Sequence, residues 1–327
     1  MTTISSLYAN ITVATASSLL TSARATYGEL ASGTTGFDTI EISDTTRMLF
    51  EVHKSLSLMQ MFAFASVDKS DEIATLQEMT EPGFDTFVQV PEPNVVIFGS
   101  STAANQKYET YDNLRAWTGS GVSHVSGGEG SEVFSGAGDD SVSVGHNSLV
   151  DAEDGNDSIV AGSNAIVVGG AGNDTISAED ASVVYGGDGD DAITAFNGST
   201  IEAGSGDDTI TAEGSTAYGG AGADSISAGG GGIVSGGLGD DSVTLTGGGV
   251  DIRFDAEHGS DTIEGGQAST IKLGSALTSH SLRVEVIGDD LSLSFDGRAE
   301  TITYRNYRGS NPRLEFADGS VIELQFG

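Results

Sequence analysis

Apolar and polar positions follow a long period in the middle of the chain. Between residues 136 and 266 a large apolar residue returns about every seventeen positions, and a second apolar position follows about eight residues after it. This spacing predicts two short strands per repeat, joined by two loops, with successive repeats stacked as turns of a coil. The first apolar set is Val142, Ile159, Ile176, Ile193, Ile210, Ile226, Val243 and Ile263, and the second is Val150, Val167, Val184, Ile201, Tyr218 and Val234. Stacked turns of this kind form two parallel sheets that face each other.

The segment before the repeats has apolar residues at helical spacing. Ile4, Leu7 and Ile11 begin this pattern, which predicts helices from residue 1 to about 80. Ser70 is placed to cap the last of these helices, which runs through Met79. Three of the four prolines then fall between residues 82 and 93, which indicates a boundary or an extended connection. A strand is expected soon after it, at residues 95–98.

The segment after the repeats alternates apolar and polar residues, as strands do. Asp296-Gly297 and Asp318-Gly319 are typical hairpin turns. An antiparallel cap is therefore expected, which would close the open end of the coil. The predicted fold is mainly β, with a helical N-terminal domain that includes a proline-containing connection at 1–118, a parallel β-roll or β-helix of about seventeen residues per turn at 119–273, and a β cap at 274–327.

Charge narrows the range of partners. The 327 residues include 13 basic and 48 acidic ones, a net charge of −35, and no Lys or Arg occurs between Ala116 and Ile252. Such a surface repels nucleic acids and anionic membranes. The chain has no cysteine, no apolar run long enough for a transmembrane helix, and no basic region at its N-terminus typical of a cleaved signal peptide. An export signal, if the protein is secreted, is expected elsewhere.

Each repeat carries one short phrase of glycine and acidic residues, such as GGAGNDTI and AGSGDDTI. An aspartate returns at the sixth place of the phrase, with steps of 17, 17, 17, 17, 16, 17 and 20 residues. These aspartates are Asp140, Asp157, Asp174, Asp191, Asp208, Asp224, Asp241 and Asp261. In stacked turns they form a column of carboxylates about 4.8 Å apart. Neighbouring charges at that distance repel by roughly 3 kcal/mol at an effective dielectric of about 20, so the column needs a cation.

The phrase resembles the nonapeptide G-G-x-G-x-D-x-U-x of the RTX family, in which U is a large apolar residue. This resemblance implies a calcium-binding β-roll. Calcium prefers carboxylate and carbonyl oxygens, whereas the scarcity of His and the lack of Cys disfavour zinc. Besides the eight aspartates, the expected calcium residues are glycines of the phrase: Gly170, Gly172, Gly187, Gly189, Gly204, Gly206, Gly220, Gly222, Gly237 and Gly239.

The resemblance has one departure. RTX rolls carry the phrase about every nine residues, but here it occurs once per seventeen, and the alternate loops lack the sixth-place aspartate. Several calcium ions are therefore expected along one edge only. The phrases around Glu153 and Glu257 have lost early glycines, which makes the sites near Asp157 and Asp261 less regular. The C-terminal segment also resembles RTX C-termini, which implies an uncleaved signal for type I secretion.

The residues show no catalytic constellation. The five histidines form no HExxH motif, and there is no GxSxG motif or P-loop, so no enzyme activity is expected. The hydrophobic segment typical of RTX cytolysins is also missing. These features favour a secreted, cell-surface calcium-binding structural protein, and analogy with RTX surface-layer proteins suggests a surface-layer or filament subunit.

Self-assembly is expected through residues 1–118, where apolar side chains crowd one stretch: Leu49, Met59, Met61, Phe62 and Phe64. These side chains would equally well fill a small helical core. Two other functions stay open at this point. One is a calcium-dependent adhesin or biofilm matrix protein that binds a cell-surface polysaccharide. The other is an enzyme with a site in residues 1–118, or an accessory module of an enzyme.

Overall fold

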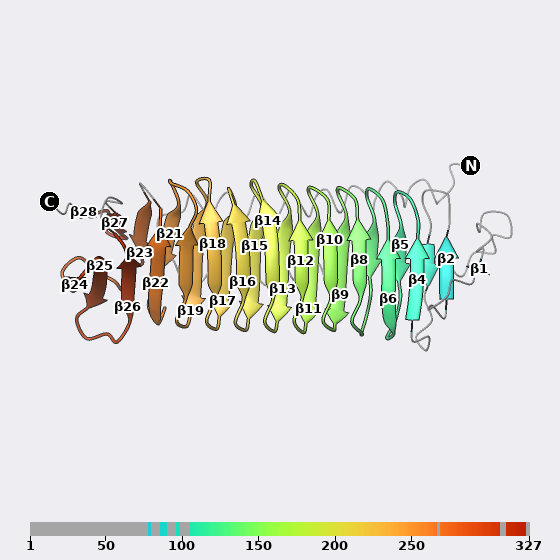
Figure 1. Cartoon of the computed structure of the whole chain (residues 1–327), viewed down its shortest axis with the longest axis horizontal. Coiled ribbons are helices and arrows are strands. Elements are labelled where there is room, and N and C mark those ends of the chain that lie inside the picture. Colours follow the sequence, from blue (N-terminus) through green and yellow to red (C-terminus); the bar gives the residue numbers. More distant parts are fainter. Residues whose placement is uncertain are drawn as a thin grey trace. The chain divides into compact units, whose positions relative to one another are not determined.

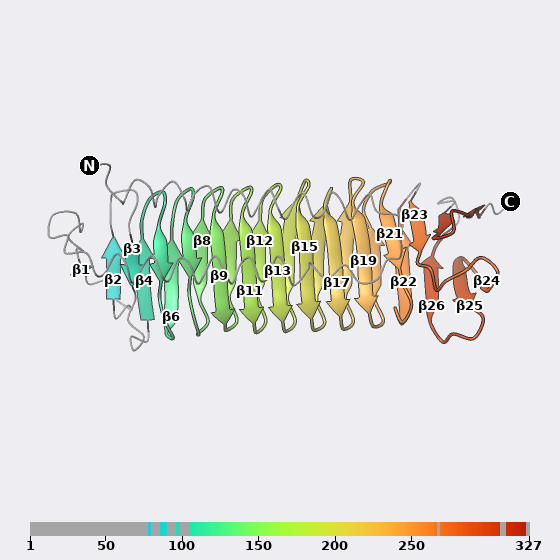
Figure 2. The same ribbon diagram turned by 180° about the vertical axis from the view of Figure 1, so that it is seen from behind.

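The described part of the chain forms a long β-coil built from two sheets that face each other (Figure 1). The computed structural model describes residues 78–79, 86–89, 96–98, 105–266, 269–307 and 312–324. The two sheets are called sheet A and sheet B below. Each turn contributes one strand to each sheet, and the strands of successive turns follow one another along the coil (Figure 2). The predicted fold class, a parallel coil with antiparallel strands at its C-terminal end, is confirmed.

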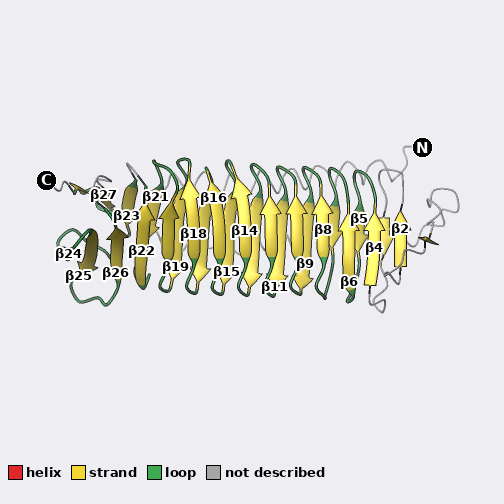
Figure 3. Cartoon of the chain, viewed as in Figure 1, coloured by secondary structure: helices red, strands yellow, loops and turns green. Residues whose placement is uncertain are grey.

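Strands and loops make up all of the described part of the chain (Figure 3). Sheet A contains, in spatial order, β1 (Glu78–Met79), β2 (Thr86–Gln89), β4 (Asn105–Glu109), β6 (Val122–Ser126), β8 (Ser141–Val144), β10 (Ser158–Ala161), β12 (Thr175–Ala178), β14 (Ala192–Phe196), β16 (Thr209–Glu213), β18 (Ser225–Gly229), β20 (Ser242–Leu245), β22 (Ser260–Gly265), β26 (Thr301–Arg305), β25 (Asp290–Phe295) and β24 (Leu282–Ile287).

Sheet B contains β28 (Val321–Glu323), β27 (Arg313–Phe316), β23 (Thr270–Leu273), β21 (Asp251–Phe254), β19 (Ile233–Leu238), β17 (Thr216–Ala221), β15 (Thr200–Ser205), β13 (Val183–Asp188), β11 (Ile166–Ala171), β9 (Leu149–Asp154), β7 (Glu132–Phe134), β5 (Arg115–Trp117) and β3 (Val96–Phe98), again in spatial order.

The core lies between the two sheets and is built from the two predicted apolar rows. Ile176 pairs in register with Ile159 and Ile193 in sheet A. Val167 pairs with Val150 and Val184 in sheet B. All six side chains are buried. Because each row repeats at the same depth in every turn, a single turn has no complete core and depends on its neighbours.

One member of the second row was assigned wrongly. Ala217, which is fully buried, pairs with Ile201 and Val234, whereas Tyr218 pairs with Glu202. This is the turn with the 16-residue step. The missing residue is in the loop between β16 and β17, so the strand after it is advanced by one position. A one-residue shift moves every side chain of a strand to its other face.

The parallel ladders extend beyond the range 119–273 in both directions. Strands β2, β4 and β6 pair in parallel in sheet A, and β3, β5 and β7 do so in sheet B. The strand expected at residues 95–98 is confirmed as β3. At the other end β26 and β27 still pair in parallel with the coil, and the expected antiparallel pairs join β24 to β25, β25 to β26 and β27 to β28.

The helices predicted for residues 1 to about 80 lie outside the described residues, except at their end. Met79 belongs to the short strand β1, which pairs antiparallel with β2, so the helix expected to run through Met79 does not include it. Within the described ranges, no helix has the length and apolar character needed to cross a membrane.

Candidate metal-binding edge

The eight sixth-place aspartates lie in one column along the coil. Each follows a turn that links a sheet B strand to the next sheet A strand, and the edge formed by these turns is called the phrase edge below. The structure therefore brings together all eight residues that the repeat predicts. The aspartates are also inside the coil: Asp174 is 1% exposed, and Asp241, the most accessible of them, is 3% exposed. Buried carboxylates need hydrogen bonds, a proton or a cation.

One oxygen of each carboxylate is used to hold the stack together. The backbone N–H of Asp157 donates to Oδ1 of Asp174, one turn further on, at 2.8 Å. The same bond joins each successive pair from Asp140 to Asp261, with distances between 2.7 and 2.9 Å. The column begins where Ser123 N–H donates to Asp140 Oδ1. Spacing alone did not predict this bond, because a period shows which residues stack but not where a carboxylate points.

The other oxygen faces the interior of the coil. Among the described residues, Oδ2 has no hydrogen-bond partner at seven consecutive positions: Asp140, Asp157, Asp174, Asp191, Asp208, Asp224 and Asp241. The first glycine of the phrase lets this oxygen lie close to the backbone. A Cβ on Gly169 would collide with Asp174 Oδ2 and would lie 2.7 Å from the carbonyl oxygen of Gly186. At Gly169, Gly186 and Gly219 a carboxylate oxygen and a carbonyl oxygen thus converge on one buried corner of the turn, and both are acceptors.

The later glycines of the phrase allow the turns to approach closely. Gly187 has φ +128°, and a Cβ there would collide with the carbonyl oxygen of Gly170. Gly189 has φ +127° and meets the carbonyl oxygen of Gly172 in the same way. The equivalent positions repeat this geometry at Gly204, Gly206, Gly220, Gly222, Gly237 and Gly239. The predicted glycines therefore line the same edge as the aspartates, with their carbonyl groups stacked along it.

Burial changes the acidity of the column. It raises the pKa of Asp140, Asp157, Asp174, Asp191, Asp208 and Asp241 to about 7, and that of Asp224 to about 6, while the hydrogen bond from the preceding turn partly opposes the effect. Negative neighbours add to the increase, for example Asp174 next to Asp191. Carboxylates with such pKa values bind either a proton or a cation near neutral pH.

The last aspartate of the column differs from the others. Asp261 Oδ2 lies 2.5 Å from Nδ1 of His258, and both side chains are buried. Burial raises the pKa of Asp261, and the bond from His258 opposes this. The turn that holds His258 contains two more residues than the others, which leaves room for the ring. A histidine therefore contacts Oδ2 here, whereas in the preceding turns Oδ2 has no hydrogen-bond partner among the described residues.

A second, exposed column runs outside the first, at the fifth place of the phrase. The backbone N–H of Asn173 donates to Asn156 Oδ1 at 2.8 Å, and that of Asp190 donates to Asn173 Oδ1 at 3.0 Å. The bonds point in the opposite direction to those of the inner column, from a later turn to an earlier one. The recurring Asp or Asn before the sixth-place aspartate is a visible signal for this column, which was not predicted.

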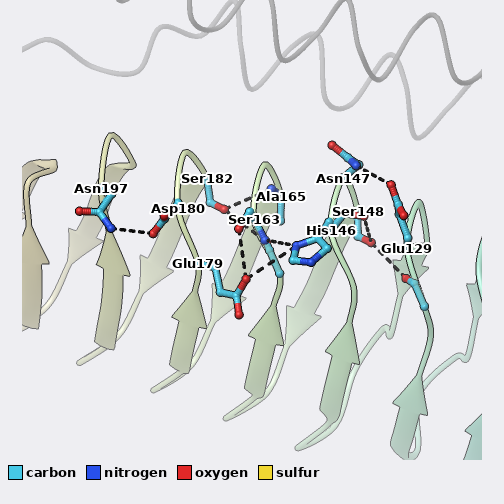
Figure 4. A network of polar contacts seen from close by, with 12 residues as sticks. Glu129, His146, Asn147, Ser148, Ser163, Ala165, Glu179, Asp180, Ser182 and Asn197 are labelled. Carbon is cyan, nitrogen blue, oxygen red and sulfur yellow. Dashed lines mark hydrogen bonds and ion pairs between the residues drawn. The ribbon is translucent and has the colours of Figure 1, made fainter.

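The loops on the other side of the coil have a different chemistry. Figure 4 shows that their polar side chains bind one another across turns. Ser163 donates through its backbone N–H to His146 Nδ1 and through Oγ to Glu179 Oε2, at 2.9 and 3.1 Å. Asn197 donates to Asp180 Oδ1 at 3.0 Å. Glu179 and Asp180 are exposed and hydrogen-bonded, so they lack the features found on the phrase edge.

In the described part of the chain, no three His, Cys, Asp or Glu side chains come close enough to hold a metal by themselves. A cation on the phrase edge would therefore be held by one or two carboxylates together with backbone carbonyl oxygens. Calcium accepts such oxygen sets, and its coordination geometry is flexible.

Comparison with known proteins adds little. No family model matches the chain, and no curated protein matches it. Among solved structures, the extracellular lipase LipA from Serratia marcescens is similar with a TM-score of 0.27 and 18% sequence identity, over 61% of this chain and 43% of the lipase. The chain thus spans less than half the length of that lipase. A similarity of this size carries no argument about function.

Proposed function

We propose that the protein is a secreted, calcium-binding structural protein whose coil folds and stiffens when calcium occupies the phrase edge. The support for this proposal is the buried column of aspartates. Among the described residues, Oδ2 of these carboxylates has no hydrogen-bond partner, and it lies close to backbone carbonyl oxygens. Acceptors that converge in a buried corner need a proton or a cation between them. The chain offers no Lys or Arg between Ala116 and Ile252 to supply the charge.

The residues present fit calcium, and some turns fit better than others. Asp174, Asp191, Asp224 and Asp241 face a glycine at the first place of the phrase, so no methyl group lies beside Oδ2. At Asp157 and Asp208 the first place is alanine instead, so a methyl group narrows the corner. At Asp261 the corner already contains His258. We therefore assign the strongest sites to the four glycine-lined turns. Bound calcium would neutralise neighbouring carboxylates and remove their repulsion.

A structural role fits this chain because its candidate calcium site is repeated from turn to turn along the coil. Its place is proposed to be outside the cell, at the cell surface, as a subunit of a surface layer or filament, with type I secretion through the C-terminal segment. Self-assembly through residues 1–118 remains part of this proposal, and most of that segment lies outside the described residues. The resemblance of the phrase to RTX repeats supports calcium and secretion, and analogy alone supports the surface layer.

Calcium titration of the full chain tests the calcium part. Circular dichroism in chelator at neutral pH should show little β structure, and added calcium should restore it with a stoichiometry of about four or more. Full β structure in excess chelator at neutral pH and low salt would contradict the proposal. Negative-stain imaging with calcium tests the structural part, since sheets or filaments support it. Separate particles that bind polysaccharide would favour the adhesin instead.

A further inference from the structure

Sheet A ends, at the C-terminal end of the coil, in an exposed edge strand. Strand β24 is the last of its sheet, and its outer edge pairs with no described strand. Its side chains Val284 and Val286 pair with Leu293 and Leu291 of β25, which are fully buried in the core. The two valines therefore extend the apolar face of the core by one strand, yet they are 41% and 44% exposed.

The other three sheet ends are much shorter than β24. Within the described residues, strand β1 has two residues, and β3 and β28 have three each, whereas β24 has six. Short edge strands discourage pairing with other chains, as do prolines and charges on the apolar face. The apolar face of β24 carries no charge, and the strand has no proline. It is thus the sheet end best suited to accept another strand.

The hydrogen-bond pattern shows which backbone groups are available. Asp296 N–H donates to the carbonyl oxygen of Ser281 at 2.9 Å, so these two residues form a hydrogen-bonded pair. Such pairs alternate along antiparallel strands. Arg283, Glu285 and Ile287 therefore direct their backbone groups to β25. The N–H and C=O groups of Leu282, Val284 and Val286 point outward.

We propose that β24 pairs antiparallel with β24 of a second copy of this chain, with Val284 opposite Val284. In this register, Leu282 of each copy lies opposite Val286 of the other copy. Residues whose backbone groups point outward therefore face one another. On the other face Arg283 lies opposite Glu285 of the second copy, and this ion pair forms twice. The contact continues sheet A from one copy into the next and joins their apolar faces.

Charge selects this register over its neighbours. The hydrogen-bond pattern permits a shift of the pairing only if outward-pointing residues stay opposite one another. The nearest permitted shift in one direction places Arg283 opposite Arg283, and the nearest in the other places Glu285 opposite Glu285. Like charges directly opposite each other destabilise a strand pair, whereas opposite charges stabilise it. The sequence of β24 is therefore complementary to itself in one register.

This contact does not depend on the proposed calcium sites, so the test holds calcium constant and measures sedimentation of the full chain. Val284→Lys should lower the mass of the sedimenting species by at least half. Val160→Lys is the matched control, because Val160 is an exposed valine on β10 in the middle of sheet A and is 52% exposed. It should leave the mass unchanged. Circular dichroism and calcium stoichiometry should be the same in both variants.

A charge-swap experiment tests the register. Arg283→Glu and Glu285→Arg each place like charges opposite each other, and each alone should weaken association about tenfold or more. When the two variants are mixed, every facing pair becomes Glu opposite Arg, and association should return as a mixed dimer. Mixing cannot repair a local folding defect, such as the loss of the Arg283–Asp296 ion pair. Failure of the mixture to associate better than the single variants, or a Val284→Lys variant that sediments like the wild type, would overturn the proposal.

Discussion

The backbone N–H of Asp174 donates a 2.8 Å hydrogen bond to Oδ1 of Asp191, which lies one turn further along the coil. Each aspartate of the column is therefore both a link in the stack and a candidate ligand. Oδ1 fixes the spacing of two turns, and Oδ2 remains for a proton or a cation. A substitution at one aspartate consequently acts on two turns at once.

Asp191→Ala should lower the calcium stoichiometry and weaken calcium binding in the turns on both sides. It removes one carboxylate and leaves the N–H of Asp174 without its acceptor, which should cost about 1–3 kcal/mol of unfolding free energy. Calorimetric calcium titration and urea unfolding in calcium measure the two effects. Glu213→Ala is the matched control, because the Glu213 side chain accepts a hydrogen bond from Thr246 at the exposed surface, on the side away from the phrase edge. If the two substitutions had equal effects, calcium would not be confined to the phrase edge.

The metal-free coil should be more stable in acid than at neutral pH. Burial raises the pKa of most of the column to about 7 from the ordinary 3.8, so the folded chain holds protons that the unfolded chain releases above about pH 4. Metal-free stability should therefore fall as the pH rises from about 4 to about 7. Calcium competes with those protons, so calcium affinity should rise over the same range.

Urea unfolding at about pH 5 and about pH 7.5, in metal-depleted buffer and in calcium, measures this effect. Without metal, the protein at the lower pH should have more β structure before urea is added and a higher midpoint. With calcium, the midpoint should be higher at the upper pH. Asp191→Asn should stabilise the metal-free protein at about pH 7.5 and destabilise the calcium form, because it keeps Oδ1 but removes the charge. A metal-free protein that is more stable at the upper pH would show that the aspartates are ionised without any ion.

Gly187→Ala should destabilise the coil far more than Gly198→Ala. Both glycines have positive φ, but a Cβ on Gly187 would strike the backbone of Gly170, whereas a Cβ on Gly198 meets nothing within 4 Å. Strain and overpacking together should cost about 3 kcal/mol or more at Gly187, and about 1 kcal/mol at Gly198. Thermal unfolding in calcium compares them. Similar losses would mean that adjacent turns do not approach as closely as the structure has them.

Removing residues 1–75 should leave a folded coil that binds calcium but forms smaller assemblies than the full chain. The deletion stops before β1, so every described strand is kept. Light scattering in calcium measures the assemblies, and Phe62→Asp in the full chain should reproduce the effect if that side chain reaches the interface. Assemblies of unchanged size would place self-assembly entirely on the strands, and would exclude residues 1–75 from it.

The period of the sequence was sufficient to predict the architecture. Ile159 and Ile176 are seventeen residues apart, and in a stacked coil that separation makes them direct neighbours, as the structure has them. The same reasoning found the aspartate column. The prediction was wrong in the turn of Tyr218. A fixed distance of eight residues from the preceding apolar position leads to Tyr218, but the loop before this strand is one residue shorter than usual. Ala217 is the small core residue there, and small residues give a weak apolar signal.

Other features were not predictable because they depend on the direction of a side chain or on the neighbouring turns of the coil. Strands β4 and β5 belong to the coil, but their turns lack the glycine phrase. The repeats predicted from the sequence therefore begin after these strands. That Oδ1 of each aspartate would bind the neighbouring turn depends on side-chain rotamers, which a spacing does not encode. His258 stood out only as a departure from the phrase, and its role became visible when its ring was found against Asp261.

The 16-residue turn has a practical consequence. Asp208 and Asp224 are one residue closer in sequence than most neighbours in the column, yet the N–H of Asp208 still reaches Asp224 Oδ1 at 2.9 Å. The loop between β16 and β17, on the side away from the aspartates, takes up the whole difference. Loops on that side can thus change length without disturbing the column, which makes them suitable places to graft foreign peptides. A long coil of this kind would display such peptides in a row, at the regular spacing of its turns.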